Sequence, residues 1–510
     1  MAWAAPAQAA QPPGQTAAQW LSLAAQVQAC VTLWALCCCW ALSGARRLRG
    51  ARAVLRTVGE GHRARRARAV GGSWPPVSVV LPTRGGAGTP EALAAALALA
   101  YDGAVEVLVG AERGVGVDDA AAALAAAQQA LAGSGGRAAI RPAKVVAAGP
   151  AVRCSQKIAQ QLACVEVASA AAEYVLFLDD DVLVPPHVLE TMVSSLEDTP
   201  EALMATGFPF DLPARAERSE EGASLLARLM QHALMQHHLP LLVPFSTAAR
   251  GHFVWGGCML FRASELRADA HGLVTRWRDG GYSDDLIAAA ASVHAARPVL
   301  SPAAAFFPQR VGAAGATARA YWGYLRRQLF VLTMWAYDGG GGGGDRCKNP
   351  AMATAHAYLS AAMVLGVGCA LRVLLRAACG GGGGRGAEAR LGGEEVALAA
   401  VTVWLFACAV AAATAITRSL AALSELLYLA GAMDGDDAGS GDTPMAEAMV
   451  AACDDSAISP LLLGAAMLLH HALVPVALTY TAASSTVVWA GRRYHRRRGK
   501  VHRVEVLAES

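Results

Sequence analysis

Three adjacent aspartates, Asp179, Asp180 and Asp181, directly follow a short apolar run that begins at Tyr174. Carboxylates this close repel one another strongly unless a cation lies between them. Hard divalent ions such as Mg²⁺ and Mn²⁺ bind one or two carboxylates together with substrate phosphates. The triplet therefore predicts a metal–phosphate site, and we favour this interpretation over an acidic turn in solvent.

A second acidic pair, Asp284 and Asp285, precedes an Ala-rich stretch of helical composition. An aspartate in this position commonly caps a helix, because its carboxylate accepts backbone N–H groups of the first turn. Ser283 or Asp284 can supply that cap, which leaves Asp285 free to face a ligand. A further acidic residue, Glu112, lies near the end of an earlier apolar run.

Cationic and glycine-containing segments supply further candidate contacts. Lys157, near a predicted helix start, is either a phosphate or acceptor contact or an ordinary solvated lysine. Gly256, beside Trp255, allows the backbone to approach a ligand closely, as where a sugar packs on the chain. Arg326 and Arg327 lie in an aromatic segment that is either an amphipathic helix on the membrane or a site for a departing diphosphate.

The elements that must position these groups follow from the hydrophobic pattern. Short apolar runs at 77–81, 105–109 and from Tyr174 are typical of buried strands. A helix is expected from Pro90, and another at 154–163, where Ser155 can act as the N-cap. Strands that alternate with helices indicate a doubly wound α/β sheet, in which ligands bind beyond the carboxyl ends of the strands.

Histidines and cysteines are also candidate metal ligands. Residues 223–245 are predicted to form one apolar helix that ends near Pro240 and carries His232, His237 and His238. No second ligand set has matching spacing, so these histidines are interpreted as core or interfacial residues. The 12 cysteines show no paired CxxC spacing, which supports neither a disulfide framework nor a cysteine-based zinc site.

The composition indicates a membrane protein, with 55% hydrophobic residues and a mean hydropathy of +0.35. The segment 20–42 is long enough to span a bilayer, and arginines follow it at once, from Arg46 onward. The positive-inside rule places the N-terminus outside or in the lumen and the next domain in the cytosol, as expected of a signal anchor. The flanking arginine runs favour a membrane surface over nucleic acid as partner.

Three more apolar segments lie near 352–371, 395–416 and 459–489. A cytosolic catalytic domain and a cytosolic basic tail require an even number of crossings between them. Three segments do not meet this requirement, so either one is interfacial or re-entrant, or 459–489 folds as a hairpin.

These observations divide the chain into seven parts. They are a disordered N-terminus (1–19), a transmembrane signal anchor (20–43), a basic linker (44–74), a cytosolic catalytic domain (75–338), a Gly-rich linker (339–351), a C-terminal membrane region with Gly-rich and acidic loops (352–490) and a basic cytosolic tail (491–510).

Several motifs together resemble the membrane-bound GT-A glycosyltransferases of the family 2/21 type, and most closely the ceramide glucosyltransferases in their plant form. The motifs are CSQKI (154–158), YVLFLDDDV (174–182), TGFPFDLP (206–213), FVWGGCM (253–259), RDGGYSDDL (278–286), YWGYLRRQ (321–328) and GRRYHRRR (491–498). The resemblance covers about residues 75–335 well and the C-terminal membrane region loosely. The implied fold class is an α/β, Rossmann-like GT-A domain with a mostly parallel sheet and N- and C-terminal transmembrane helices.

The resemblance implies inverting transfer of glucose from UDP-glucose to ceramide by an integral protein of the Golgi or ER membrane. Asp179 and Asp181 match the pair that holds Mg²⁺ or Mn²⁺ on the diphosphate, Glu112 stands near the uracil, and Asp285 matches the base.

Other expected contacts lie on the donor and acceptor sides of the same site. Asp284, Trp255, Gly256 and Lys157 are expected on the acceptor or sugar side. Arg326 and Arg327 are the candidates for the diphosphate, although Phe330 stands where the family motif (Q/R)xxRW has Trp.

Three other functions fit parts of the sequence. A processive polysaccharide synthase of the cellulose, chitin or hyaluronan type shares the acidic centres but normally keeps that Trp. A sugar transferase acting on a lipid phosphate, such as a dolichyl-phosphate enzyme, is a further alternative. A non-catalytic scaffold or a transporter would explain the membrane spans but not the placement of the acidic residues. Charged residues buried within the spans would favour a transporter. His470 and His471, which lie inside one apolar segment, give little support for that function.

Overall fold

The computed structural model describes residues 17–59, 74–84, 89–133, 141–214, 224–247, 249–312, 315–334, 344–379, 392–432 and 450–507. The predictions for the first 16 residues, for the glycine runs and for most of the acidic loop 433–456 lie outside these ranges.

An eight-stranded sheet carries the acidic residues, with the strand order β3-β2-β1-β4-β8-β5-β9-β7. Its first four strands are parallel, whereas β8 runs antiparallel to both β4 and β5. The strands are β1 (Val77–Pro82), β2 (Val105–Glu112), β3 (Ala143–Ala148), β4 (Tyr174–Leu178), β5 (Met204–Thr206), β7 (Arg250–Gly251), β8 (Cys258–Arg262) and β9 (Val299–Leu300). The predicted strands and the predicted α/β GT-A class are confirmed.

Helices cover both faces of this sheet because its strands are apolar on both sides. Val79 of β1 packs in one core with α3 (Thr89–Leu97), α4 (Val117–Gly133) and α6 (Val188–Glu197). Val80 faces the opposite core, formed with α5 (Gln156–Val167), α10 (Leu273–Arg278) and α11 (Asp284–His294). The predicted cap is confirmed, since the Ser155 hydroxyl accepts the Ile158 N–H at the start of α5.

The apolar segment after the sheet is two helices rather than the single helix predicted. They are α7 (Leu225–Met235) and α8 (His238–Thr247), and Pro240 lies in the first turn of α8 instead of ending a helix. Proline is tolerated there because first-turn N–H groups have no intrahelical acceptor. A short parallel pair of strands, β6 (Phe208–Pro213) and β10 (Phe306–Val311), packs beside them.

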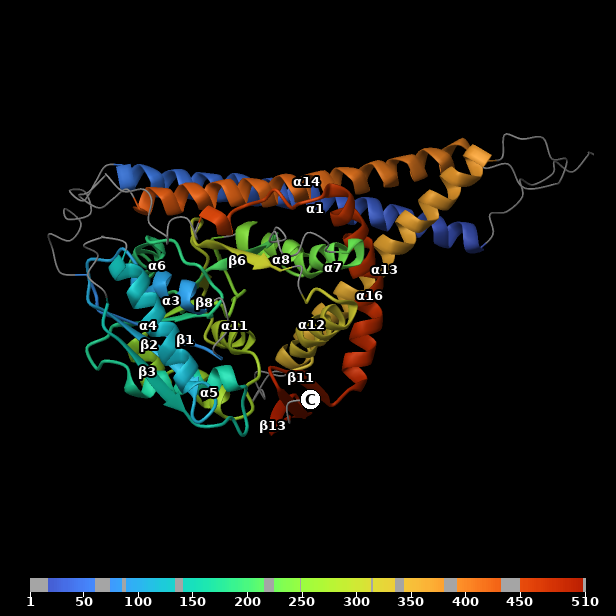
Figure 1. The fold of residues 1–510 in the computed structure, drawn as a ribbon. Helices are drawn as coiled ribbons and strands as arrows, with labels where there is room; N and C mark the ends of the chain where they lie inside the picture. Colours follow the sequence, from blue (N-terminus) through green and yellow to red (C-terminus); the bar gives the residue numbers. More distant parts are fainter. Residues whose placement is uncertain are drawn as a thin grey trace, which may run out of the picture.

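Four helices in the described part of the chain are long and apolar enough to cross a membrane. They are α1 (Ala17–Gly59), α13 (Gly344–Cys379), α14 (Gly393–Ala432) and α16 (Pro460–Ala483). α1 and α14 lie side by side along one side of the molecule (Figure 1), and both also contact α13. α16 runs from these helices toward the opposite side, along α7 and α12 (Ala318–Val331).

Two arginines after the first apolar segment fasten α1 to the catalytic domain. Arg47 is fully buried, and its guanidinium donates to Ser246 Oγ and to the Phe245 and Pro302 carbonyls at 3.0–3.1 Å. Arg46 donates to the Phe245 carbonyl at 3.1 Å. From the sequence, the arginines from Arg46 onward are interpreted as contacts to the membrane surface. That interpretation does not hold for Arg46 and Arg47, which contact the folded domain instead.

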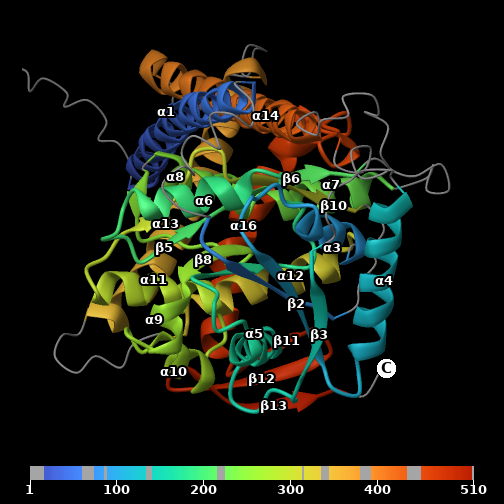
Figure 2. The same ribbon diagram turned by 90° about the vertical axis from the view of Figure 1, so that its left-hand side faces the viewer.

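The basic tail folds into a three-stranded antiparallel sheet, β11 (Thr486–Trp489), β12 (Arg492–Arg497) and β13 (Lys500–Val506). Two-residue loops join the strands, and both residues of each loop, Ala490-Gly491 and Arg498-Gly499, have positive φ. This is the geometry of type I′ hairpin turns. Figure 2 shows the small sheet below α5, on the side of the molecule opposite α1 and α14.

Candidate active site

The three aspartates that follow β4 have different partners. Asp180 accepts the Thr83 hydroxyl at 2.7 Å and the Arg84 N–H at 3.3 Å, so it ties the end of β4 to the end of β1. Asp179 and Asp181 flank it and line the same cavity. The middle carboxylate thus has a structural role, and the outer two face the cavity.

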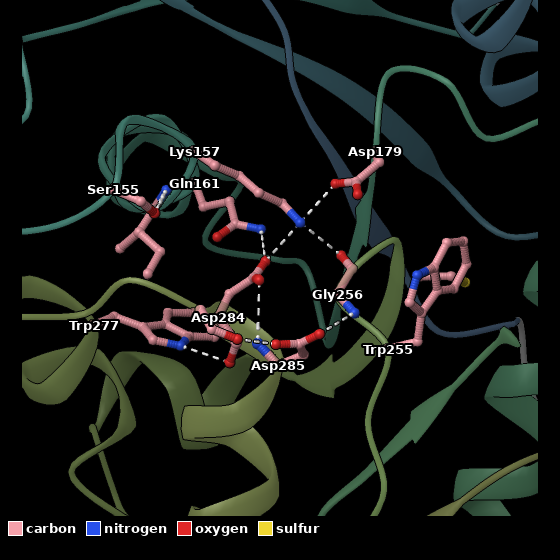
Figure 3. A network of polar contacts seen from close by, with 12 residues as sticks. Ser155, Lys157, Gln161, Asp179, Trp255, Gly256, Trp277, Asp284 and Asp285 are labelled. Carbon is pink, nitrogen blue, oxygen red and sulfur yellow. Dashed lines mark hydrogen bonds and ion pairs between the residues drawn. The ribbon is translucent and has the colours of Figure 1, made fainter. Parts of the chain in front are cut away.

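Lys157 joins the two acidic segments. Its ammonium lies 2.7 Å from Asp179 Oδ1 and 2.9 Å from Asp284 Oδ2, and it donates to the Gly256 carbonyl at 3.0 Å (Figure 3). The lysine side chain is 17% exposed, which excludes the alternative of an ordinary solvated lysine. The Lys157 ammonium therefore links the C-terminal end of β4 to the N-terminal end of α11.

The helix start at α11 orients the second acidic pair. Ser283 is the N-cap, since its hydroxyl accepts the Leu286 N–H at 3.3 Å. Asp284 is buried and also accepts Gln161 Nε2 at 2.8 Å. Asp285 lines the cavity, where its Oδ1 accepts the Ser283 hydroxyl and its Oδ2 accepts the Gly256 N–H at 3.3 Å.

Gly256 is the point where the backbone passes between these groups. A Cβ there would lie 2.7 Å from Asp284 Oδ1 and 3.1 Å from Lys157 Nζ. A side chain here would force Asp284 to shift, so the buried neighbours themselves favour glycine at this position, and a close approach of the backbone to a ligand stays a prediction. The next residue along the chain toward the N-terminus, Trp255, lines the cavity, and its backbone N–H donates to Thr206 Oγ1 at 3.0 Å.

Burial shifts the acid–base properties of the cluster. Desolvation raises the pKa of Asp179 to about 7; Lys157 opposes this increase, and Asp181 and Asp284 add to it. Desolvation also raises the pKa of Asp285, and the neighbouring Asp284 carboxylate adds to that increase. A carboxylate with a raised pKa is a stronger base, which suits proton abstraction.

The acids lie in a cavity of about 1060 Å³ that extends into the membrane helices. Its polar part contains the aspartates after β4 and at the start of α11. Its apolar part is lined by Leu36 of α1, Leu241 of α8, and Leu359 and Met363 of α13. One continuous space therefore offers anionic groups and a wall built from apolar helices.

The two candidate arginines of α12 point in different directions. Arg327 lines the cavity, and its guanidinium lies 5.0 Å from the centre of the Trp489 ring. Arg326 packs over the Tyr480 ring of α16 at 4.6 Å and reaches the Thr486 carbonyl at 3.4 Å. The structure thus brings Arg327, and not Arg326, to the aspartates.

Glu112 has a partner that the sequence did not indicate. At the end of β2 it is buried against Arg492 of β12, with which it forms an ion pair. The neighbouring Tyr494 hydroxyl accepts the Gln156 N–H at 3.4 Å and lines the cavity, whereas Glu112 does not. The C-terminal sheet therefore closes one side of the site.

The residues after β4 fit a hard divalent cation. Asp179 and Asp181 offer carboxylate oxygens in a cavity with room for a phosphorylated ligand, which is the donor set that Mg²⁺ and Mn²⁺ favour. Arg327 and Lys157 place positive charge near Asp181 on the cavity wall, which Arg84 also lines.

Several residues of the site escaped sequence reasoning, namely Thr83, Gln160, Gln161, Trp489, Arg492 and Tyr494. Thr83 follows the predicted strand 77–81, and Gln160 and Gln161 lie within the predicted helix at 154–163. The Ala490-Gly491 and Arg498-Gly499 pairs, each between short runs that contain β-branched or aromatic residues, are turn signals of the C-terminal sheet, but they do not indicate its position.

Comparisons with known proteins identify one family. A family model described as glycosyl transferase family 21 matches residues 22–336. No curated protein matches the chain.

Among solved structures, glucosyl-3-phosphoglycerate synthase from Mycobacterium tuberculosis is similar in two complexes. The complex with phosphoglyceric acid is 16% identical and the complex with Mn²⁺, UDP and glucosyl-3-phosphoglycerate is 18% identical; each covers 52% of this chain and 81% of its own, with a TM-score of 0.25. Nothing about activity follows from similarities this low.

Proposed function

The chain belongs to glycosyl transferase family 21, and from that premise we propose that it transfers glucose from UDP-glucose to the primary hydroxyl of ceramide. One observation carries this proposal: the acidic cluster and an apolar wall made by membrane helices share a single cavity. Such a cavity suits a reaction between a charged nucleotide sugar and a lipid that stays in the bilayer.

The donor is proposed to bind at the ends of β4 and β1. Asp179 and Asp181 would hold Mg²⁺ or Mn²⁺, which when bound neutralises charge that gathers on the leaving diphosphate. Arg327 faces the same space and would bind the diphosphate as well. The uracil would lie toward Tyr494, beside the Glu112–Arg492 pair.

Asp285 is proposed as the base. A primary hydroxyl is a poor nucleophile at neutral pH, so a carboxylate that takes its proton as the new C–O bond forms contributes about 10²–10⁴-fold. The proton passes from the ceramide oxygen to Asp285, and the bond from the anomeric carbon to the diphosphate breaks, which releases UDP. The Gly256 N–H and the Ser283 hydroxyl orient the carboxylate for this role. With one base on the far face, the anomeric carbon inverts and no covalent sugar–enzyme intermediate is needed.

Trp255, Gly256 and Asp284 are proposed to form the sugar side of the site. Lys157 pairs with Asp179 and Asp284, whereas no ion pair is seen for Asp285 among the described residues, so Asp285 is the carboxylate proposed to act on the acceptor. The lipid chains would lie along α1, α8 and α13, because removing ceramide from the bilayer costs about 0.8 kcal/mol for each CH₂ group.

The helix arrangement supports a membrane topology with three crossings. α1 and α14 begin, and α13 ends, on the same side of the molecule, away from the sheet (Figure 1). α16 starts beside α7, where the Ser459 N–H donates to His232, and ends beside α12, where Ser484 contacts Arg326. We propose that α16 lies against the catalytic domain at the membrane surface. The catalytic domain and the C-terminal sheet then share the cytosolic side of a Golgi or ER membrane.

Transfer of labelled glucose from UDP-glucose to ceramide tests the proposal. Membranes that contain the chain are assayed with and without EDTA, beside Asp285→Asn. A labelled lipid that disappears in both controls supports metal-dependent, base-assisted transfer. A labelled polymer would indicate a processive synthase instead, and the absence of product from every UDP-sugar would favour a scaffold or transporter.

A further inference from the structure

Three histidines from the apolar helices α13 and α16 meet away from the acidic cluster. His356 lies on α13, and His470 and His471 lie on α16; one ligand nitrogen from each is within 4.8 Å of the other two. His470 is 1% exposed and His471 is 8% exposed. The ring centres are 5.2 Å apart for His470 and His471 and 6.4 Å apart for His356 and each of them.

Hydroxyl groups hold two of these rings in place. His470 Nδ1 lies 2.9 Å from the Tyr321 hydroxyl of α12, and His471 Nδ1 lies 2.9 Å from the Ser360 hydroxyl of α13. When Nδ1 donates to such a hydroxyl, the proton resides there and Nε2 keeps its lone pair. Metal-binding histidines are oriented by the same kind of bond on the second ring nitrogen.

One nitrogen in this cluster has no partner. His470 Nε2 is buried and makes no hydrogen bond to any residue that the structure describes. Buried polar groups are normally paired, so an unpaired imidazole nitrogen in a cluster with two further histidines needs an explanation. A metal ion among the three rings supplies the missing partner.

We propose that His356, His470 and His471 bind a divalent transition-metal ion of the zinc type. Three imidazoles with one open position form a known tetrahedral zinc arrangement, and imidazole suits zinc far better than it suits Mg²⁺. Tetrahedral Zn–N bonds of about 2.0–2.1 Å place the nitrogens about 3.4 Å apart, closer than the 4.8 Å within which they lie here, so binding would draw the three rings together. His356 and His471 line the large cavity, so the open position faces that space.

This site is separate from the one proposed for the sugar donor. Its ligands are neutral nitrogens on α13 and α16, whereas the donor site offers the carboxylates of Asp179 and Asp181. The ion would fasten α13 to α16 and, through Tyr321, to α12 of the catalytic domain. The proposal does not depend on which sugar or lipid the enzyme uses.

Metal content tests the proposal directly. The full chain is purified in detergent with an affinity tag that contains no histidine, passed through metal-free buffer, and analysed by inductively coupled plasma mass spectrometry. We expect about one zinc per chain in the unaltered protein and a loss of at least tenfold in His470→Ala and in His356→Ala. His502→Ala, which alters an exposed histidine of β13, and Asp179→Asn should both retain the metal.

A second measurement applies even if the histidine variants fail to fold. The unaltered protein is stripped with chelator and loaded with Co²⁺, whose visible absorption is intense in a tetrahedral site and weak in an octahedral one. An intense spectrum with one Co²⁺ per chain is expected. Absence of bound zinc after incubation with excess Zn²⁺, or an unchanged zinc content in folded His470→Ala, would overturn the proposal.

Discussion

The chemistry of the site depends on how single charges are paired. Lys157 contacts Asp179 and Asp284, and Thr83 and Arg84 contact Asp180, so most carboxylates of the cluster have a fixed structural partner. Asp285 is held by the Ser283 hydroxyl and by the backbone N–H groups of Gly256 and Leu286, with no cation in direct contact among the described residues. It is the carboxylate best placed to accept a proton from a substrate.

Asp285→Asn should reduce the turnover number by about 10²–10⁴-fold, because the amide cannot take up the proton. Donor binding should be preserved, since the base is not a ligand of the diphosphate. Initial rates, together with titration of UDP in the presence of Mn²⁺, separate the two effects. An Asn variant with normal turnover would exclude Asp285 as the base.

Metal binding should weaken below about pH 7. The raised pKa of Asp179, about 7 in the folded protein, means that this carboxyl is neutral below that pH and must lose its proton to bind a cation. Affinity should fall by up to tenfold for each pH unit below about 7, because one proton is released on binding. The same shift stabilises the metal-free fold at low pH, and that contribution is lost as the pH rises from 3.8 through about 7.

Titration calorimetry of Mn²⁺ with UDP across this range measures the effect. A pH-independent affinity would contradict the assignment of Asp179 as a buried ligand that must ionise on binding.

At the scale of elements, sequence reasoning succeeded where the signal was local. The strands of the parallel sheet, the Ser155 cap and the cap at Ser283 follow from residues next to one another, and all three are confirmed. The ion pair of Glu112 and Arg492 joins residues 380 positions apart, and no local pattern indicates it. The burial of Arg47 among backbone carbonyls is a tertiary feature of the same kind.

The C-terminal sheet should be held on the catalytic domain largely by that ion pair. Arg492→Met leaves Glu112 buried without its partner, which typically costs about 3–5 kcal/mol. The combined change of Glu112→Gln with Arg492→Met should cost less, since no uncompensated charge remains. Thermal unfolding in detergent gives the order of stability.

Arg493→Met on the same strand is the matched control. Arg493 is 45% exposed and lies 3.6 Å from Glu505, so its removal should leave the melting temperature unchanged. Equal destabilisation by the changes at 492 and 493 would show that loss of charge in the tail, and not the buried pair, determines stability.

At the scale of the whole molecule, the catalytic domain is fixed to the membrane helices at several points. α1 is fastened by Arg47, and α16 by His232 at its start and Arg326 at its end. The cavity between these attachments receives residues from α1, α8, α12 and α13. Helices that anchor the chain therefore also form the wall of the site.

The proposed three crossings place the segment between α13 and α14 on the side opposite the catalytic domain. An N-glycosylation acceptor introduced there by Gly382→Asn and Gly384→Ser should be modified in the ER lumen. Ala438→Asn, which creates Asn-Gly-Ser between α14 and α16, should stay unmodified. Mobility shifts that reverse with endoglycosidase report both results, and glycosylation at 438 would contradict the topology.

The product of the purified protein tests the central claim most directly. The chain is reconstituted in lipid nanodiscs with ceramide, Mn²⁺ and UDP-glucose, and the lipid product is identified by mass spectrometry and proton NMR. The account predicts one glucose per ceramide with a β linkage, because a single base and no covalent intermediate invert the α linkage of the donor. An α-linked product, a chain of several sugars, or glucose on an acceptor other than ceramide would contradict it.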